Sequence, residues 1–338
     1  MRTIKYFALA SALLLLLTGC GARQPEATRQ IFAMDTVMDL YAVGEDAEAL
    51  LTEAAQEINR LESLLSRTRA GSDVSILNET GTAQLSDETA ALLDAALHYA
   101  DITGGAFDVT IAPLVEAWNI HGENPRVLTE GEIAALLPLV GSHHLRLSGA
   151  AATLDEGCAI DLGGIAKGYA SDVIARLYRD RGMTGGWISL GGNVYAHGTK
   201  PDGSFWNVAV RDPMDAAATA AMVQLSNQFA VTSGGYQRYF TAGDGTVYQH
   251  ILDPKTGIPA MSDLLSVTIV CGNGTMADAY STALYVMGEA EAVSFWAANR
   301  AEFDMILITA DNRLLYTPGL AGRVTTEEGG AYEVQVLS

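Results

Sequence analysis

Apolar residues recur at helical spacing in several stretches of the first half of the chain. Residues 45–66 place six of them on one stripe, which predicts a helix with a single buried face (Leu50, Leu51, Ala54, Ile58, Leu61 and Leu65). A second helix is predicted from Ser86 to Ile102, where adjacent glycines stop it. Thr129 and Glu132 have capping-box spacing and predict a third helix, and a fourth is predicted from Ala166 to Gly182.

The pattern changes after Trp187. From there to residue 253 the chain consists of short, β-rich segments separated by Gly, Asp and Pro, which predicts an antiparallel sheet built from hairpins. Residues 32–43 alternate enough to predict one further strand. Two helices (275–287 and 289–299) and two strands (near 304–309 and 333–337) close the chain. The predicted class is α+β, with helices packed on a largely antiparallel sheet in one domain over residues 31–338.

The N-terminus has the pattern of a targeting segment. Arg2 and Lys5 precede an apolar run that is too short to span a bilayer as a permanent helix. The run ends in Leu-Thr-Gly-Cys, which resembles a bacterial lipoprotein cleavage box with Cys20 as the lipidated residue. An ordinary secretory signal is the alternative. We therefore expect a signal peptide at 1–19, a lipid-anchored tether at 20–30, and a location outside the cytoplasm at the bacterial cell membrane.

The charge of the chain narrows the choice of ligands. Lys and Arg total 20 against 40 Asp and Glu, which gives a net charge of -20. Such a surface repels nucleic acid and anionic lipid headgroups, so an anionic substrate needs a local metal ion or clustered backbone N–H groups. Cys158 and Cys271 form no known motif. They are predicted to be buried small apolar residues, and a disulfide between them is the alternative.

The segment "TMADAYSTALYVMG" (275–288) offers oxygen ligands on one helix face. Asp278 and Thr282 are four residues apart, with Ser281 beside them. A carboxylate and hydroxyls in this arrangement suit Mg²⁺ better than zinc or copper. The alternative is structural: Asp278 favours the positive end of its own helix, and Thr282 hydrogen-bonds back to a carbonyl.

Two glycine turns could approach a ligand closely. In "AIDLGGIAKGYASD" (159–172), strand-like residues lead to Gly163-Gly164 and then to Lys167 at a helix start, an arrangement that suits a phosphate but lacks P-loop spacing. In "TGGAFDVTIAP" (103–113), Phe107 could cover a flat ring and Asp108 could accept hydrogen bonds. The alternatives are an ordinary glycine turn and a helix C-cap followed by a core phenylalanine.

His250 stands at the end of a predicted strand, directly before the turn "DPKTG". It is either a structural or solvated histidine, or an exposed general acid/base beside a turn that binds a ligand. No other motif of hydrolytic chemistry, such as G-x-S-x-G or H-E-x-x-H, is present.

Seven motifs in order resemble the ApbE family of FAD:protein FMN transferases over about residues 31–320. They are Met34-Asp35-Thr36, "TGGAFD", "DLGGIAKGYA", "SLGGN", "TSGGYQRYF", "HILDPKTGIP" and "ADAYSTALYVMG". The resemblance implies a magnesium-dependent enzyme that moves the FMN half of FAD onto a Thr or Ser hydroxyl of an acceptor protein and releases AMP. It implies His250 as the catalytic residue, and metal ligands at Gly164 (carbonyl), Asp278, Ser281 and Thr282. The implied FAD contacts are Met34, Thr68, Ala106, Phe107, Asp108, Asp161, Lys167 and Leu252.

Two positions depart from the pattern of the family. Thr68 stands where the family pattern has an aromatic residue over the flavin, and Gly235 stands where an acidic residue is frequent. A looser flavin cover favours water as the acceptor, so hydrolysis of FAD to FMN and AMP is the alternative activity. A third possibility is a flavin-binding lipoprotein without turnover, which the presence of Asp278, Thr282 and His250 disfavours.

Overall fold

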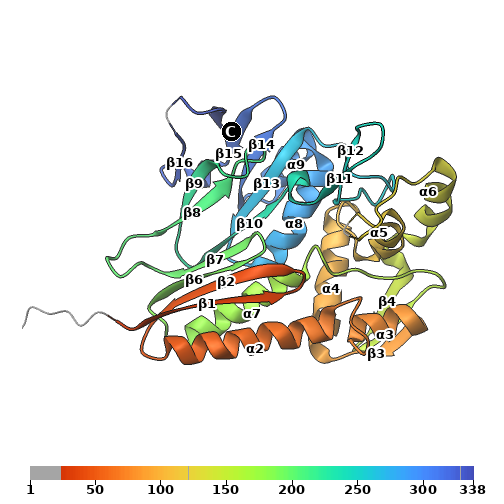
Figure 1. The fold of residues 1–338 in the computed structure, drawn as a ribbon, viewed down its shortest axis with the longest axis horizontal. Coiled ribbons are helices and arrows are strands. Elements are labelled where there is room, and N and C mark those ends of the chain that lie inside the picture. The colour runs from red at the N-terminus through yellow and green to blue at the C-terminus, as the bar shows by residue number, and fades with distance from the viewer. Residues whose placement is uncertain (1–23, 121, 328) are drawn as a thin grey trace, which may run out of the picture.

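The computed structural model describes residues 24–120, 122–327 and 329–338, and its largest element is a nine-stranded sheet (Figure 1). Neighbouring strands are antiparallel except for the parallel pair β15 and β17. The predicted α+β class with a largely antiparallel sheet is confirmed. In spatial order the strands are β1 (Glu26–Ala33), β2 (Thr36–Val43), β6 (Gly185–Leu190), β7 (Asn193–Gly198), β10 (Gln228–Ser233), β13 (Leu264–Cys271), β14 (Asp304–Thr309), β15 (Arg313–Tyr316) and β17 (Glu333–Val336).

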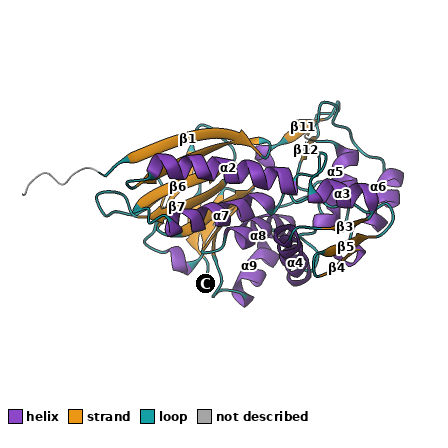
Figure 2. Cartoon of the chain, turned by 90° about the horizontal axis from the view of Figure 1, so that it is seen from below, coloured by secondary structure: helices purple, strands orange, loops and turns teal. Residues whose placement is uncertain are grey.

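Four helices pack against one face of this sheet (Figure 2): α2 (Ala47–Leu65), α7 (Ala166–Asp180), α8 (Gly274–Met287) and α9 (Glu289–Ala298). Helix α2 buries the six stripe residues that predicted it, and each fully buried large apolar side chain contributes about 1.5–3 kcal/mol. All four helices start within two residues of their predicted positions.

A second, three-stranded sheet covers part of the opposite face. It consists of β8 (Trp206–Arg211), β9 (Thr219–Leu225) and β16 (Val324–Thr325). Its apolar residues form a core with Ala230, Val270, Ile306 and Ile308 of the large sheet. Strand β13 is therefore buried on both faces, so its sequence is a continuous apolar run without alternation. Because this run does not alternate, the hydrophobic pattern did not predict β13.

A mainly helical region adjoins one end of the large sheet, on the right of Figure 1. The ring of Trp118 in this region packs at an angle of 36° against that of Tyr248, in the hairpin of β11 (Tyr239–Thr241) and β12 (Val247–Gln249). The predicted capping box is confirmed: Thr129 and Glu132 bond each other's backbone at the start of α6. The elements are α3 (Asp73–Thr80), β3 (Thr82–Gln84), α4 (Asp87–Ile102), α5 (Ala112–Trp118), α6 (Glu130–Leu136), β4 (Leu145–Ser148), β5 (Ala151–Leu154), β11 (Tyr239–Thr241) and β12 (Val247–Gln249), with 3-10 helices at Val109–Ile111, Leu137–Leu139, Ser142–His144, Gly235–Gln237 and Pro318–Leu320.

Three expectations about extended segments are wrong. Residues 32–43 form no single strand, because a two-residue turn at Met34-Asp35 divides them between β1 and β2. Residues 26–30, expected in the tether, belong to β1 and pair with β2; their polar composition hid a strand whose alternate side chains face the helices. Residues 159–162 lie outside any strand, since contacts other than a strand ladder hold them. The Asn78 side chain bonds to both backbone groups of Ile160, and Asp161 N–H donates to the Val109 carbonyl.

The predicted signal peptide, Cys20 and the first residues of the tether lie outside the described residues. In the part of the chain that the structure describes, no helix combines the length and apolar character needed to cross a bilayer. Cys158 and Cys271 are both free and buried, as predicted. Burial raises the pKa of Cys271 to about 12, so this thiol stays protonated at neutral pH.

Candidate functional site

Helices α7 and α8 cross where two glycines face each other. A Cβ atom on Gly168 would lie 2.3 Å from the carbonyl oxygen of Gly274, and one on Gly274 would lie 2.8 Å from that of Gly168. Since both contacts are with backbone, no larger residue fits at either position. The crossing brings Asp278 to the first turn of α7, where its Oδ2 accepts a 2.8 Å hydrogen bond from Gly168 N–H.

Asp172 makes the mirror-image contact at the start of α8. Its Oδ1 accepts from Gly274 N–H at 2.8 Å, and its Oδ2 accepts from Thr275 N–H at 2.7 Å and Thr275 Oγ1 at 2.6 Å. Burial raises the pKa of Asp172, and the hydrogen bonds from Thr275 and Gly274 oppose this rise. Each helix thus supplies a carboxylate to the positive end of the other. We call Gly168, Asp172, Gly274 and Asp278 the junction.

Asp278 and Thr282 make other contacts than those that the structural alternative predicts, in which both residues serve their own helix. Asp278 does not serve the start of its own helix, which is capped by Asn273 through a 2.9 Å bond from Met276 N–H. The hydroxyl that hydrogen-bonds back along α8 is that of Ser281, at 2.9 Å from the Asp278 carbonyl.

A cluster of hydroxyl groups lies beside the junction. Ser233, at the end of β10, has its Oγ 2.8 Å from Ser281 Oγ and 3.4 Å from Thr282 Oγ1. Gly164 adjoins the same threonine, since a Cβ atom there would lie 3.6 Å from Thr282 Oγ1 and 3.2 Å from the Phe107 ring. Three motifs that are far apart in the sequence therefore meet in space: "TGGAFD", "DLGG" and "ADAYST".

The implied FAD contacts of the "TGGAFD" motif lie beside this cluster, since the Phe107 ring adjoins Gly164. Ala106 and Phe107 are buried. Asp108 is buried too, and its Oδ1 accepts hydrogen bonds from Thr110 N–H (2.8 Å) and Thr110 Oγ1 (2.7 Å), so it caps a short helical turn. Asp161 accepts 2.7 Å hydrogen bonds from Gly163 N–H and from the guanidinium Nε of Arg67.

Lys167 lies in the first turn of α7, where its ammonium group donates to the Gly163 carbonyl at 2.9 Å. This contact holds a positive charge beside the Gly163-Gly164 turn and the positive end of the helix. Thr68, by contrast, is exposed, and its hydroxyl lies 3.2 Å from Ser66 Oγ. The structure therefore leaves Thr68 outside the buried group of site residues.

His250 and Met34 come together through Arg238. Arg238 forms an ion pair with Asp35, and its Nη2 also donates to the Asp35 carbonyl at 2.6 Å. Its own carbonyl oxygen lies 3.1 Å from both the backbone nitrogen and Nδ1 of His250. Met34 and Asp35 have positive φ angles of 47° and 59°, and Glu62 accepts a 2.7 Å bond from Met34 N–H. We call Met34, Asp35, Arg238 and His250 the lip.

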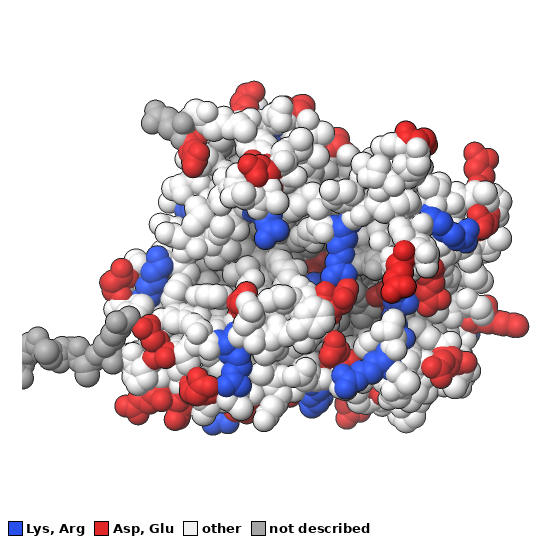
Figure 3. Space-filling view, viewed as in Figure 1, with Lys and Arg blue, Asp and Glu red and all other residues white. Residues whose placement is uncertain are grey.

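The carbonyl contact selects one tautomer of the neutral His250 ring. A carbonyl oxygen only accepts hydrogen bonds, so Nδ1 carries the hydrogen and Nε2 of the neutral ring carries the lone pair. His250 is partly exposed. The face of the molecule in Figure 3 is hollowed in the area where Figure 1 draws the end of the β1–β2 hairpin and the β11–β12 hairpin. Leu252 is buried and lines a small cavity with His250 and Trp118.

Sequence reasoning missed three residues that shape the site. Asp172 stands one helical turn after Gly168 inside a motif already singled out, and this spacing was the available signal. Arg67, the ion-pair partner of Asp161, directly precedes Thr68 in a chain poor in basic residues. Glu62 had no signal, because its bond to Met34 depends on the unpredicted turn.

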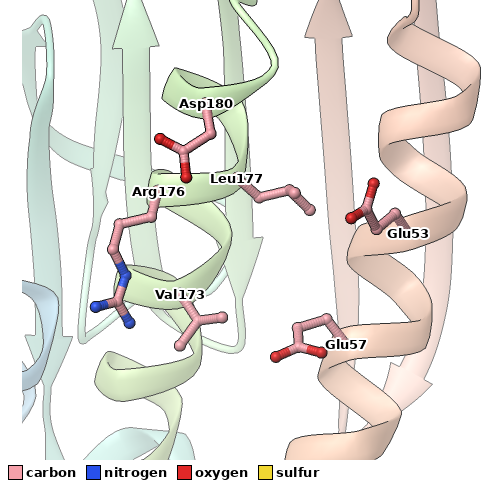
Figure 4. Close-up of a pocket in the computed structure, with 6 residues that line it drawn as sticks. All are labelled: Glu53, Glu57, Val173, Arg176, Leu177 and Asp180. Atoms are coloured by element: carbon pink, nitrogen blue, oxygen red, sulfur yellow. The ribbon is translucent and has the colours of Figure 1, made fainter.

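A groove of about 370 Å³ lies elsewhere, between α2 and α7 (Figure 4). Glu53 and Glu57 face it from α2, while Leu177 reaches across from α7 and Arg176 points away from α2. Glu53 pairs with Arg181 and Glu57 with Arg60, so these carboxylates already have ionic partners. None of the predicted site residues lines the groove, and the motifs point to the junction and the lip instead.

Comparison with known proteins decides the family. The family model described as the ApbE family matches residues 34–307, a span that includes both the junction and the lip. The chain belongs to the ApbE family. This ApbE-family chain is a transferase, as the seven motifs predicted.

Relatives with curated names support the same conclusion. The chain is 30% identical over 319 residues to the FAD:protein FMN transferase of Vibrio cholerae, covering 91% of this chain and 95% of the relative. It is 33% identical over 334 residues to the FAD:protein FMN transferase of Treponema pallidum, covering 90% and 91%. The crystal structure of the ApbE protein of Thermotoga maritima superposes with a TM-score of 0.83 at 29% identity, over 90% of this chain and all of the other.

Proposed function

We propose that this ApbE-family chain moves the FMN half of FAD onto a Ser or Thr hydroxyl of an acceptor protein and releases AMP. The observation that carries the proposal is the contact of Asp278 with the first turn of α7, with Gly164 adjoining Thr282. His250 at the lip is proposed to serve the same site. The names of the relatives, FAD:protein FMN transferase, support the substrate.

The oxygen groups beside the junction fit Mg²⁺. Within the described residues no group of three or more His, Cys, Asp and Glu could hold a metal ion. Asp278 instead offers one carboxylate on the helix that also carries the hydroxyls of Ser281 and Thr282, and Gly164 adjoins Thr282. Hard oxygen donors with few carboxylates are typical of magnesium bound together with substrate phosphates. A bound Mg²⁺ would neutralise charge on the pyrophosphate, which matters in a chain of net charge -20.

The chain's own groups would position the substrate. Lys167 and the backbone N–H groups of the first turn of α7 offer positive charge to the phosphates. Phosphoryl transfer depends mostly on in-line placement and charge stabilisation. The lone pair on His250 Nε2 would accept the proton of the incoming hydroxyl, while Arg238 holds Nδ1–H in place. An exposed base is what transfer to another protein's side chain requires.

The alternative activity, hydrolysis of FAD to FMN and AMP, draws support from Thr68. This residue is exposed, and within the described chain it bonds to its neighbour Ser66. A threonine side chain also has no ring to cover a flavin. If flavin cover controls the choice of acceptor, Thr68→Tyr should lower the rate of AMP release without acceptor by several-fold. An unchanged rate in this variant would contradict the link between cover and hydrolysis.

We also propose that the chain is anchored through a lipid on Cys20, outside the cytoplasmic membrane. The Leu-Thr-Gly-Cys segment after an apolar run supports this. Because β1 begins at Glu26, the span from Cys20 to the sheet is six residues, at most about 20 Å. The enzyme would then work on acceptor segments close to the membrane surface. Metabolic labelling with a radioactive fatty acid tests this, and Cys20→Ser should abolish the label.

The test of function follows AMP release from FAD and Mg²⁺ with and without a candidate acceptor protein. Transfer predicts AMP that depends on the acceptor, together with a mass gain of one FMN on the acceptor. AMP formed at the same rate without acceptor would show that the chain is chiefly a hydrolase.

A further inference from the structure

Asn193 carries a polar group that the fold leaves without a partner. The residue is 2% exposed, and its Nδ2 has no hydrogen-bond partner within the described residues. A buried amide without a partner costs about 1–3 kcal/mol, so native proteins keep very few. Asn193 directly follows Gly191-Gly192, whose positive φ angles of 60° and 103° give the chain its tight turn between β6 and β7.

Strand register places Asn193 beside the candidate site. Asn193 pairs with Val231 of β10, so the two side chains share one face of the sheet. Ser233 lies two residues further along β10 on that face, where its hydroxyl contacts Ser281 and Thr282. Diagonal neighbours of this kind have Cα atoms about 7–8 Å apart. The shared face is the one that packs against α7 and α8, because Val231 belongs to their core.

The unpartnered donor therefore points into the layer between the sheet and the starts of the two helices. Helix α7 packs on this side of the sheet, and Lys167 lies in its first turn with its ammonium group bonded to Gly163 in an exposed position. Nothing in the described chain uses Asn193 Nδ2, whereas the neighbouring Ser233 is bound on both sides.

We infer that Asn193 is a substrate-binding residue whose Nδ2 donates a hydrogen bond to a phosphate oxygen of the bound dinucleotide. This inference rests on the proposed function, since it takes FAD as the ligand. A neutral amide suits this buried position because it adds a donor without placing an unpaired charge in the core. Binding of substrate would give Asn193 Nδ2 the partner that it lacks within the described chain.

The test compares binding of FAD with binding of riboflavin, which has the ring but no phosphate. Asn193→Leu keeps the shape of the side chain and removes the donor. The dissociation constant for FAD should rise by about tenfold or more, as expected for a hydrogen bond to a charged group, while that for riboflavin stays the same. The apo variant should unfold at the same or a higher temperature, because an unpaired donor has been removed from the core.

A matched control removes another unpaired donor. Ser266 is fully buried on β13, its Oγ has no partner within the described residues, and it lies on the opposite face of the sheet from Val267 and its partner Ser233. Ser266→Ala should leave FAD affinity unchanged. If leucine disturbs folding, Asn193→Ala removes the same donor in a smaller side chain and should give the same selective loss.

Two results would overturn the inference. One is an unchanged FAD affinity in both Asn193 variants, and the other is an equal loss of FAD and riboflavin binding. Binding is measured without an acceptor protein, so the result is independent of transfer. A wild-type chain that binds FAD through Asn193 but flavinylates no acceptor would contradict the proposed transferase and leave this contact standing.

Discussion

The junction and the lip hold the two halves of the candidate site by different means. At the junction, backbone meets backbone at Gly168 and Gly274, and two carboxylates are bonded to helix amides. At the lip, an ion pair between the exposed side chains of Arg238 and Asp35 joins the β1–β2 turn to the segment before β11, and the Arg238 carbonyl contacts His250. Asp278 is 4% exposed, whereas the Asp35 side chain is 73% exposed.

The difference separates what must be rigid from what can adapt. Close-packed backbone cannot shift without loss of many contacts, so the junction fixes the oxygen groups that would face a metal ion and phosphates. An exposed ion pair contributes only about 0–1 kcal/mol, so the lip can move at little cost when another protein approaches. The exposed apolar side chains of Tyr239 and Val247 lie on the β11–β12 hairpin of the same lip region. Changes at the junction should therefore affect every reaction, and changes at the lip should affect transfer most.

The largest effect is expected for Asp278→Asn. The asparagine carbonyl still accepts the bond from Gly168 N–H, but the negative charge is gone. AMP release that depends on Mg²⁺ should fall by more than about a thousandfold, with thermal unfolding nearly unchanged. Isothermal calorimetry should show loss of Mg²⁺ binding in the presence of a non-hydrolysable FAD analogue.

Asp172→Asn is the control for Asp278→Asn. Asp172 accepts three hydrogen bonds from Gly274 and Thr275, and an amide places an N–H group against one of these donors. This variant should lose stability rather than the Mg²⁺ dependence of its remaining activity. Full Mg²⁺-dependent turnover in Asp278→Asn would remove the metal assignment from the junction.

His250→Gln should have the next largest effect. Glutamine can keep a polar contact at the lip, but it cannot accept a proton near neutral pH. Transfer to an acceptor protein should slow by about a hundredfold or more, with FAD affinity unchanged, because the junction is untouched. Rapid-quench measurement of FMN transfer and fluorescence titration of FAD give the two values. Loss of FAD binding in this variant would make His250 a ligand contact rather than a base.

Gly168→Ala tests the rigidity of the junction directly. The added methyl group would lie 2.3 Å from the Gly274 carbonyl and 2.6 Å from Asp278 Cβ, so the two helices must separate. The free energy of unfolding should fall by about 1–3 kcal/mol, and turnover should fall with it. Gly131→Ala in α6 is the control, since nothing lies within 4 Å of its Cβ position, and it should be neutral or stabilising by up to about 1 kcal/mol. Equal stability of both variants would contradict tight packing at the crossing.

The sequence predicted the parts of the fold whose signals are local. The apolar stripe of α2 and the capping box of α6 need only neighbouring residues to be recognised. Strand β13 was not predicted because burial on both faces removes the alternation of apolar and polar residues. The turn at Met34-Asp35 was not predicted because it lacks the usual glycine or asparagine. Those left-handed residues are held by partners distant in sequence, Glu62 and Arg238.

The same limit applies to the site. The motifs supplied Asp278, Thr282 and His250, but no local pattern shows that Asp278 bonds to Gly168, 110 residues away, or that Arg238 orients His250. Asn193 lay in a recognised glycine turn, yet only the fold reveals that its amide has no partner. Residue types are thus readable from sequence, whereas pairings between distant segments require the packed structure.

The smallest effect is expected for Asp35→Asn, which weakens the lip without dismantling it. The ion pair with Arg238 is lost, but the bond from Arg238 to the Asp35 carbonyl remains. Stability should change by less than about 1 kcal/mol and FAD affinity should stay the same, while transfer falls a few-fold because the Arg238 carbonyl holds His250 less firmly. Since salt screens an exposed pair, raising ionic strength should slow the wild type more than the variant.

Glu53→Gln is the control for Asp35→Asn, because it breaks an exposed ion pair with Arg181 at a distance from the site motifs and should leave transfer unchanged. The rate of FMN transfer is measured at low and high salt for the wild type, Asp35→Asn and Glu53→Gln. Only Asp35→Asn should differ from the wild type in its dependence on salt. A fall of several kcal/mol in the stability of Asp35→Asn, or a loss of FAD binding, would mean that the lip is as rigid as the junction. In that case the two halves of the site would not divide the work between holding the substrate and admitting the acceptor.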